Sequence, residues 1–184
     1  MARIPDRAPA SLDDDRRALY EAIAGGPRAA GLQHFPLTRA DGSLRGPFNA
    51  MLLAPGIGAA LQELGSAIRY RGTLSARSRE IAILLVAARW DSPFEREAHE
   101  AVGRAAGLDD EELVALRRED AARFAGVEGA TARATLAMLD GDLDDEAWAA
   151  AEAALGAAGV FELTTLVGYY ATLALQLRVF RVGA

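Results

Sequence analysis

The residue types and spacings best suited to chemistry in this 184-residue sequence occur between residues 92 and 99. Ser92, Glu95 and His99 are three and then four residues apart, so a helix would place all three side chains on one face. A carboxylate next to an imidazole can hold a histidine in one tautomer, which suits general acid–base catalysis near neutral pH. The same residues also have a structural interpretation, with Ser92 as a helix N-cap and Glu95 completing a capping box.

A further carboxylate, Glu80, precedes this segment within a strongly apolar stretch. It lies three and four residues before Ile83 and Leu84, so a helix would place it on an apolar face. An ion pair with Arg77, with Arg104 or with another arginine across the bundle would explain Glu80 without any catalytic role, and spacing alone favours that interpretation.

Residue types that are absent exclude several chemistries. The sequence has no cysteine and no lysine, so all 20 basic residues are arginines. Thiol redox steps, Cys-ligated metals and Schiff-base lysines are therefore excluded. Only two histidines occur, so we expect no metal site.

The charge and hydropathy patterns restrict the partners. A net charge of −6 with scattered arginines argues against nucleic acid. The first residues lack the apolar segment typical of a signal peptide, and no unbroken apolar run of about 18 residues occurs, so we expect a cytoplasmic protein with no membrane partner.

The composition predicts an all-α fold, because alanine and leucine are abundant and β-branched residues are sparse. We expect one domain over residues 1–184, with an N-terminal arm, short helix and loop over 1–45 and a helical core over 46–184. Tyr169 and Tyr170 are expected to be core or interface aromatics. The expected helices cover residues 13–24, 48–54, 56–70, 75–90, 92–107, 109–117, 130–139, 144–155 and 160–180.

Three stretches together resemble the carboxymuconolactone decarboxylase-like family of the alkylhydroperoxidase D-like superfamily. They read GPFNAMLLAPGIGAALQELGSAIRYRG, LSARSREIAILLVAARWDSPFEREAHEAVGRAAGL and FELTTLVGYYATLALQLRVF. The resemblance implies an alkylhydroperoxidase D-like helical bundle that assembles as a homotrimer or homohexamer.

The resemblance also aligns the candidate residues with those of peroxidase relatives. Glu80 and His99 match the glutamate and the histidine of that branch, while Ser92 and Glu95 stand where its two cysteines would be. A serine alcohol cannot be reduced and reoxidised, so the thiol relay is unavailable. The spacing of Glu95 and His99 instead resembles that of the decarboxylase-type members.

What the resemblance implies is a cofactor-independent carbon–carbon lyase that decarboxylates a small cyclic or lactone organic acid. We hypothesise that His99 carries the proton, that Glu95 orients it and that Glu80 holds or relays a proton. Substrate-binding candidates are an arginine clamp and three weaker positioning residues. These residues are Arg77, Arg71, Asn49, Tyr70 and Ser92.

Two alternatives stay open at this stage. The same pocket could serve a hydrolase, isomerase or cyclase acting on a small carbonyl compound, since one proton shuttle serves all of these reactions. A non-catalytic oligomeric ligand-binding protein is the other alternative, because a fold by itself does not assign an activity.

Overall fold

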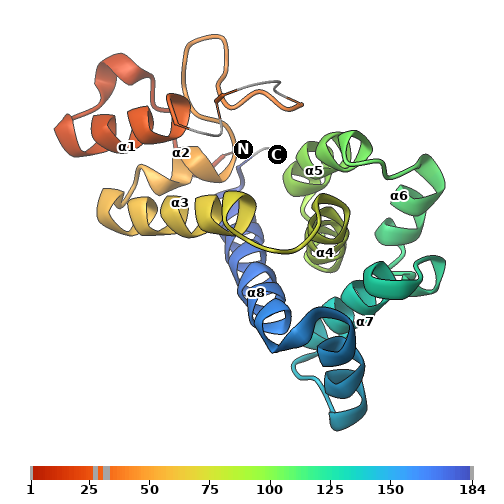
Figure 1. Ribbon diagram of the computed structural model, residues 1–184. Coiled ribbons are helices and arrows are strands. Elements are labelled where there is room, and N and C mark those ends of the chain that lie inside the picture. The colour runs from red at the N-terminus through yellow and green to blue at the C-terminus, as the bar shows by residue number, and fades with distance from the viewer. Residues whose placement is uncertain (1, 27–28, 31–33, 183–184) are drawn as a thin grey trace. The chain divides into compact units, whose positions relative to one another are not determined.

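The computed structural model describes residues 2–26, 29–30 and 34–182 (Figure 1). Over these residues the chain forms eight α-helices and two short 3-10 helices and contains no strand, with one isolated antiparallel bridge between Thr38 and Leu44. The predicted all-α fold class is therefore confirmed. The helices are α1 (Asp14–Ala24), α2 (Pro47–Met51), α3 (Pro55–Tyr70), α4 (Ala76–Arg89), α5 (Pro93–Ala105), α6 (Asp110–Arg117), α7 (Gly126–Asp140) and α8 (Asp145–Phe180), and the 3-10 helices are Pro9–Ser11 and Ala121–Arg123.

The chain separates into two compact units. The first combines Met1–Arg71 with Leu175–Ala184, and the second is Gly72–Ala174. Helix α8 begins in the second unit and ends in the first. The expectation of a single domain stays a prediction.

In the first unit, α3 packs against α1 and α2. Asp13 caps α1 by accepting a hydrogen bond from the backbone N–H of Arg16, and this bond is the main reason that the pKa of Asp13 lies below its usual value. Pro55 occupies the first turn of α3, where its missing N–H costs no hydrogen bond. The predicted break at Pro55 is therefore the start of the next helix.

The second unit is built around α4, which contacts α5, α6 and α7. Ser75 caps this helix by accepting a hydrogen bond from the Ser78 N–H, as predicted. Every residue from Glu80 to Ala87 is buried, so α4 is enclosed on most sides. Its side chains Ile81, Leu84 and Leu85 form one hydrophobic cluster with residues of α6, α7 and the segments that flank α6.

Helix α8 consists of two helical parts, as the sequence predicted, because Gly156 interrupts it with a backbone conformation that essentially only glycine adopts (φ 69°, ψ 162°). By length and composition, α8 could cross a membrane, a test that core helices of soluble proteins also pass. Because its apolar residues form no unbroken run, the sequence did not predict this property of α8. The expected absence of a membrane partner stays a prediction.

Candidate functional site

His99 and Glu80 meet across the contact between α4 and α5 in the second unit. The Nδ1 atom of His99 lies 2.7 Å from Oε2 of Glu80. Glu80 is fully buried, and the His99 side chain is 11% exposed. Because an ionised carboxylate only accepts hydrogen bonds, Glu80 as a carboxylate requires the proton of this contact to be on Nδ1.

Glu95 lies on the other side of the same imidazole. Its Oε2 atom is 3.4 Å from Nε2 of His99, one turn along α5. The side chain of Glu95 is also buried, at 4% exposure. The histidine is thus placed between two carboxylates, one on each ring nitrogen, with the tighter contact at Nδ1.

This arrangement changes the roles expected for the two carboxylates. The sequence hypothesis gave the orienting role to Glu95, but the short contact comes from Glu80. The spacing of four residues identified the neighbour on the same helix, whereas the closer neighbour comes from another helix. Glu95 instead faces Nε2, the nitrogen that remains for proton exchange with a ligand.

Tyr170 of α8 packs against the ring of His99. The two rings meet edge to face, with centroids 5.1 Å apart and planes at 90°. Tyr169 packs against Tyr170 in the same manner, at 5.2 Å and 87°. Both tyrosines are buried, in agreement with the expected packing role.

The capping box predicted at the start of α5 does not form. Ser92 is the N-cap residue and Pro93 the first helical residue, as expected, but the Ser92 side chain makes no capping hydrogen bond. Its Oγ atom is buried and has no hydrogen-bond partner in the described part of the chain. Glu95 contacts His99 instead. Helix capping therefore does not explain why Ser92 and Glu95 occur at these two positions.

Ion pairs with Arg77 or Arg104, the favoured explanation for Glu80, are also absent from the described residues. Arg77 pairs with Glu112 at 2.7 Å and with Glu128 at 2.7 Å. Arg104 pairs with Asp110 at 3.0 Å. Both arginines are engaged elsewhere, whereas Glu80 contacts His99 and lies 3.8 Å from Nε of its neighbour Arg79.

The predicted substrate-binding arginines both contact carboxylates. In Arg77, hydrogen bonds to Glu128 and Glu112 hold the pKa of the guanidinium above its ordinary value, and the side chain also donates to the Gly107 carbonyl. This is a structural contact between helices, so the expected clamp role of Arg77 is not supported by its surroundings. Arg71 pairs with Glu63 at an exposed position of the first unit.

Two of the three weaker positioning candidates, Asn49 and Tyr70, also belong to the first unit. Asn49 is buried; it donates to the Pro5 carbonyl and accepts from the Arg7 N–H, so it fastens the N-terminal arm. Tyr70, at the end of α3, is 46% exposed. Their assignment to substrate binding stays a prediction.

The sequence did not lead us to predict Arg79 as a charged neighbour of the site. Arg79 precedes Glu80 on α4, and its Nε atom lies 3.8 Å from Oε1 of Glu80. Its side chain is 14% exposed. The signal was available in the sequence, because a basic residue directly beside a carboxylate on an apolar helix is unusual.

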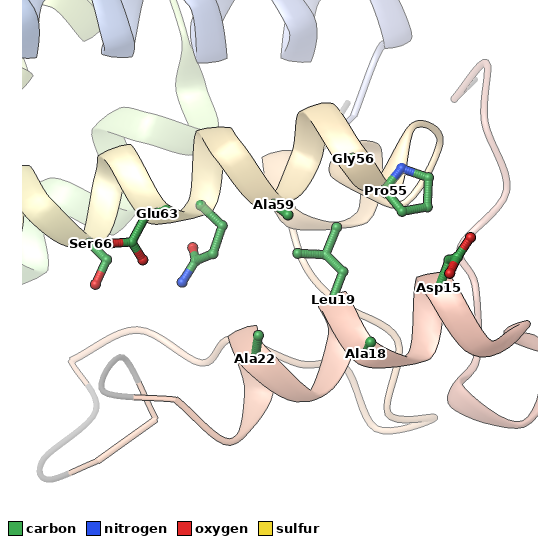
Figure 2. Close-up of a pocket in the computed structure, with 10 residues that line it drawn as sticks. Asp15, Ala18, Leu19, Ala22, Pro55, Gly56, Ala59, Glu63 and Ser66 are labelled. Atoms are coloured by element: carbon green, nitrogen blue, oxygen red, sulfur yellow. The ribbon is translucent and has the colours of Figure 1, made fainter.

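The first unit carries a surface groove of about 740 Å³ between α1 and α3. Figure 2 shows Leu19, Ala22 and Ala59 facing one another across it, with Asp15 near one end and Glu63 and Ser66 toward the other. None of its lining residues is a predicted site residue. Across the described residues, no group of three or more His, Asp or Glu side chains is arranged to hold a metal ion.

The fold and the site together define an all-α protein whose buried imidazole is flanked by two carboxylates, in a chain without a thiol. Residues 55–138 match the model of the carboxymuconolactone decarboxylase family, in agreement with the resemblance found in the sequence. The matched segment includes Glu80, Glu95 and His99. No curated protein and no solved structure gives a significant match.

Proposed function

We propose that this protein is a cofactor-independent carbon–carbon lyase that decarboxylates a small cyclic or lactone organic acid by general acid–base catalysis. The observation that carries the proposal is the placement of His99 between Glu80 and Glu95, with Nδ1 held at 2.7 Å and Nε2 in the looser contact. The family match supports a function of this general type.

In the proposed reaction, the carbon–carbon bond to the departing carboxylate breaks and carbon dioxide leaves. The bonding electron pair passes into an adjacent carbonyl group, which gives an enolate. The protonated Nε2 of His99 then transfers its proton to the carbon, and the imidazole regains a proton from solvent. Glu80 keeps the ring oriented throughout and stabilises its protonated form.

Ser92 is proposed to contact the substrate. Its Oγ atom is buried on the same face of α5 as His99 and lacks a hydrogen-bond partner among the described residues. A buried hydroxyl without a partner costs free energy, and a substrate oxygen would supply the missing hydrogen bond.

The direct test is turnover of carboxymuconolactone and related cyclic acids by the wild type and by His99→Gln and Glu80→Gln. We expect His99→Gln to lower kcat by about 10²- to 10⁴-fold, the usual contribution of a general acid. Glu80→Gln should lower it by about 10²-fold, because the amide can still accept the Nδ1–H hydrogen bond but lacks the negative charge that stabilises the protonated ring. Glu97→Gln, an exposed carboxylate on the same helix, is the matched control and should be neutral.

Product masses separate the proposed reaction from the alternatives. Decarboxylation lowers the substrate mass by one carbon dioxide, hydrolysis adds one water, and isomerisation or cyclisation leaves the mass unchanged. Full turnover in both site variants would refute the assigned roles. Binding of these acids by the wild type without any turnover would instead indicate a ligand-binding protein.

A further inference from the structure

Glu162 of α8 binds the short segment that leads into α4. Its Oε2 atom accepts hydrogen bonds from the backbone N–H of Thr73 at 2.7 Å and from the Thr73 hydroxyl at 2.9 Å. Its Oε1 atom accepts a third from the backbone N–H of Leu74 at 3.1 Å. These residues all belong to the second unit, and Glu162 is 89 positions from Thr73 in the sequence. One carboxylate thus joins two elements of this unit that are far apart along the chain.

The hydrogen bonds of Glu162 are directional, unlike the apolar contacts of the same helix. Leu163 and Leu166 of α8 are fully buried. Hydrophobic burial has no preferred direction, so it does not by itself fix the position of a helix along its axis. Hydrogen bonds need short distances and a favourable angle, and those to an ionised acceptor are the stronger ones. Glu162 therefore fixes the register of α8 against the start of α4.

The two helices that Glu162 connects both contact His99. Helix α4 supplies Glu80, whose Oε2 atom lies 2.7 Å from Nδ1 of His99. Helix α8 supplies Tyr170, whose ring meets the imidazole edge to face at 5.1 Å. Tyr170 follows Glu162 by eight residues, about 12 Å along a helix. Since the break at Gly156 precedes both, the helix between them is continuous and transmits a shift from one to the other.

The imidazole of His99 needs both contacts to keep a single orientation. The contact with Glu80 fixes the Nδ1 atom, but a ring held at one atom can still turn about that contact. The ring of Tyr170 restricts this rotation, because paired aromatic rings prefer defined relative orientations. A displacement of Tyr170 would therefore move Nε2 while the contact at Nδ1 is kept.

We propose that Glu162 is a positioning residue of the site. Its hydrogen bonds to Thr73 and Leu74 set the register of α8, and α8 in turn holds the ring of Tyr170 against His99. This inference rests on the proposed function for its effect on turnover, whereas its effect on the orientation of the imidazole is independent of the reaction.

The test observes the imidazole directly in the full-length protein. The sequence contains two histidines, and the second one, His34, is exposed in the first unit, so it serves as an internal reference. In NMR spectra, the ring signals of His99 carry a ring-current shift from Tyr170. We expect Glu162→Ala to move the His99 signals and to leave those of His34 in place. On carboxymuconolactone, kcat should fall by up to about 10²-fold, the cost of a misplacement of about 1 Å, with KM nearly unchanged.

Glu152→Ala is the matched control. Glu152 is an exposed carboxylate of α8 that lies before the break at Gly156, so its removal should change neither the His99 signals nor kcat. Glu162→Gln keeps one acceptor oxygen and places an amide donor at the other position. It should move the signals less than the alanine variant does, and it covers the case in which that variant does not fold. Thr73→Ser keeps all three hydrogen-bond donors and should match the wild type.

Unchanged His99 signals in both Glu162 variants would overturn the positioning role, and a loss of stability alone would then show that the contact is purely structural. Displaced signals together with full turnover would also overturn it, because the reaction would not depend on the orientation that Glu162 maintains. Displaced signals in Glu162→Ala, alongside a wild type that decarboxylates none of the acids, would refute the proposed lyase and leave the orientation of His99 by Glu162 intact.

Discussion

His99 is held by carboxylates from two different helices, and this decides which of its nitrogens can react. The 2.7 Å contact with Glu80 occupies Nδ1. Among the described residues, the carboxylate nearest to Nε2 is Glu95 at 3.4 Å, a longer contact that a ligand or a water molecule could replace more easily. We therefore propose that the contact at Nδ1 orients the ring and that Nε2 exchanges the proton.

A double-mutant cycle tests this difference between the two carboxylates. Glu80→Ala should destabilise the protein by about 1–3 kcal/mol, because a buried N–H of His99 loses its acceptor. Combined with His99→Ala, it should show a coupling energy of about 1–3 kcal/mol. The free energies of unfolding come from urea denaturation of the four proteins.

The control cycle pairs Glu95→Ala with His99→Ala. Its coupling should be smaller, because the Glu95 contact is longer by 0.7 Å. A coupling for Glu95 equal to or larger than that for Glu80 would contradict the assignment of Nδ1 as the anchored nitrogen.

At the level of helices, Arg77 connects α4 to three other segments. It pairs with Glu112 of α6 and Glu128 of α7, and it donates to the carbonyl of Gly107 in the turn after α5. These contacts fix the position of α4, the helix that carries Glu80. Arg77 thus stabilises the position of Glu80 without contacting the residues of the site.

Arg77→Met should therefore cost about 1–3 kcal/mol of unfolding free energy, since two partly buried carboxylates lose their partner. Because the folded state raises the pKa of Arg77, its contribution is fully present below the ordinary pKa of arginine and is lost only in strong base. Chemical denaturation at neutral pH measures the effect.

Arg71→Met is the control for this prediction, because Arg71 and Glu63 form a pair in which both side chains are about two-thirds exposed. Its removal should change stability by no more than about 0.5 kcal/mol. Equal losses in the two variants would show that Arg77 is no more than a surface ion pair.

Helix starts with strong local signals were predicted correctly from the sequence, such as Ser75 before α4 and Asp109 before α6. The capping box at Ser92 was not, because the carboxylate of Glu95 contacts a histidine instead of the helix start. Local spacing found the residues of the site. The pairing of Glu80 with His99 depends on how α4 packs against α5. The spacing of residues within one helix does not predict such a contact.

At the level of the whole molecule, both compact units leave large apolar side chains in contact with solvent. Ile57 of the first unit is 68% exposed, and Phe161 of the second is 75% exposed. Single exposed apolar residues are common, but α8 also has an apolar composition sufficient for a membrane span. Further copies of the chain and a lipid phase are the two coverings that we compare by experiment.

We expect self-association, with a homotrimer or a homohexamer as the predicted state, because symmetric assembly covers such surfaces without a lipid phase. Light scattering of the purified protein should give three or six times the chain mass of 19.4 kDa. Phe161→Ser should shift this mass downward if Phe161 lies in the interface, whereas Thr172→Ser, an exposed polar position on the same helix, should leave it unchanged. A strict monomer at micromolar concentration would contradict the prediction, and recovery only in detergent would favour a membrane role for α8.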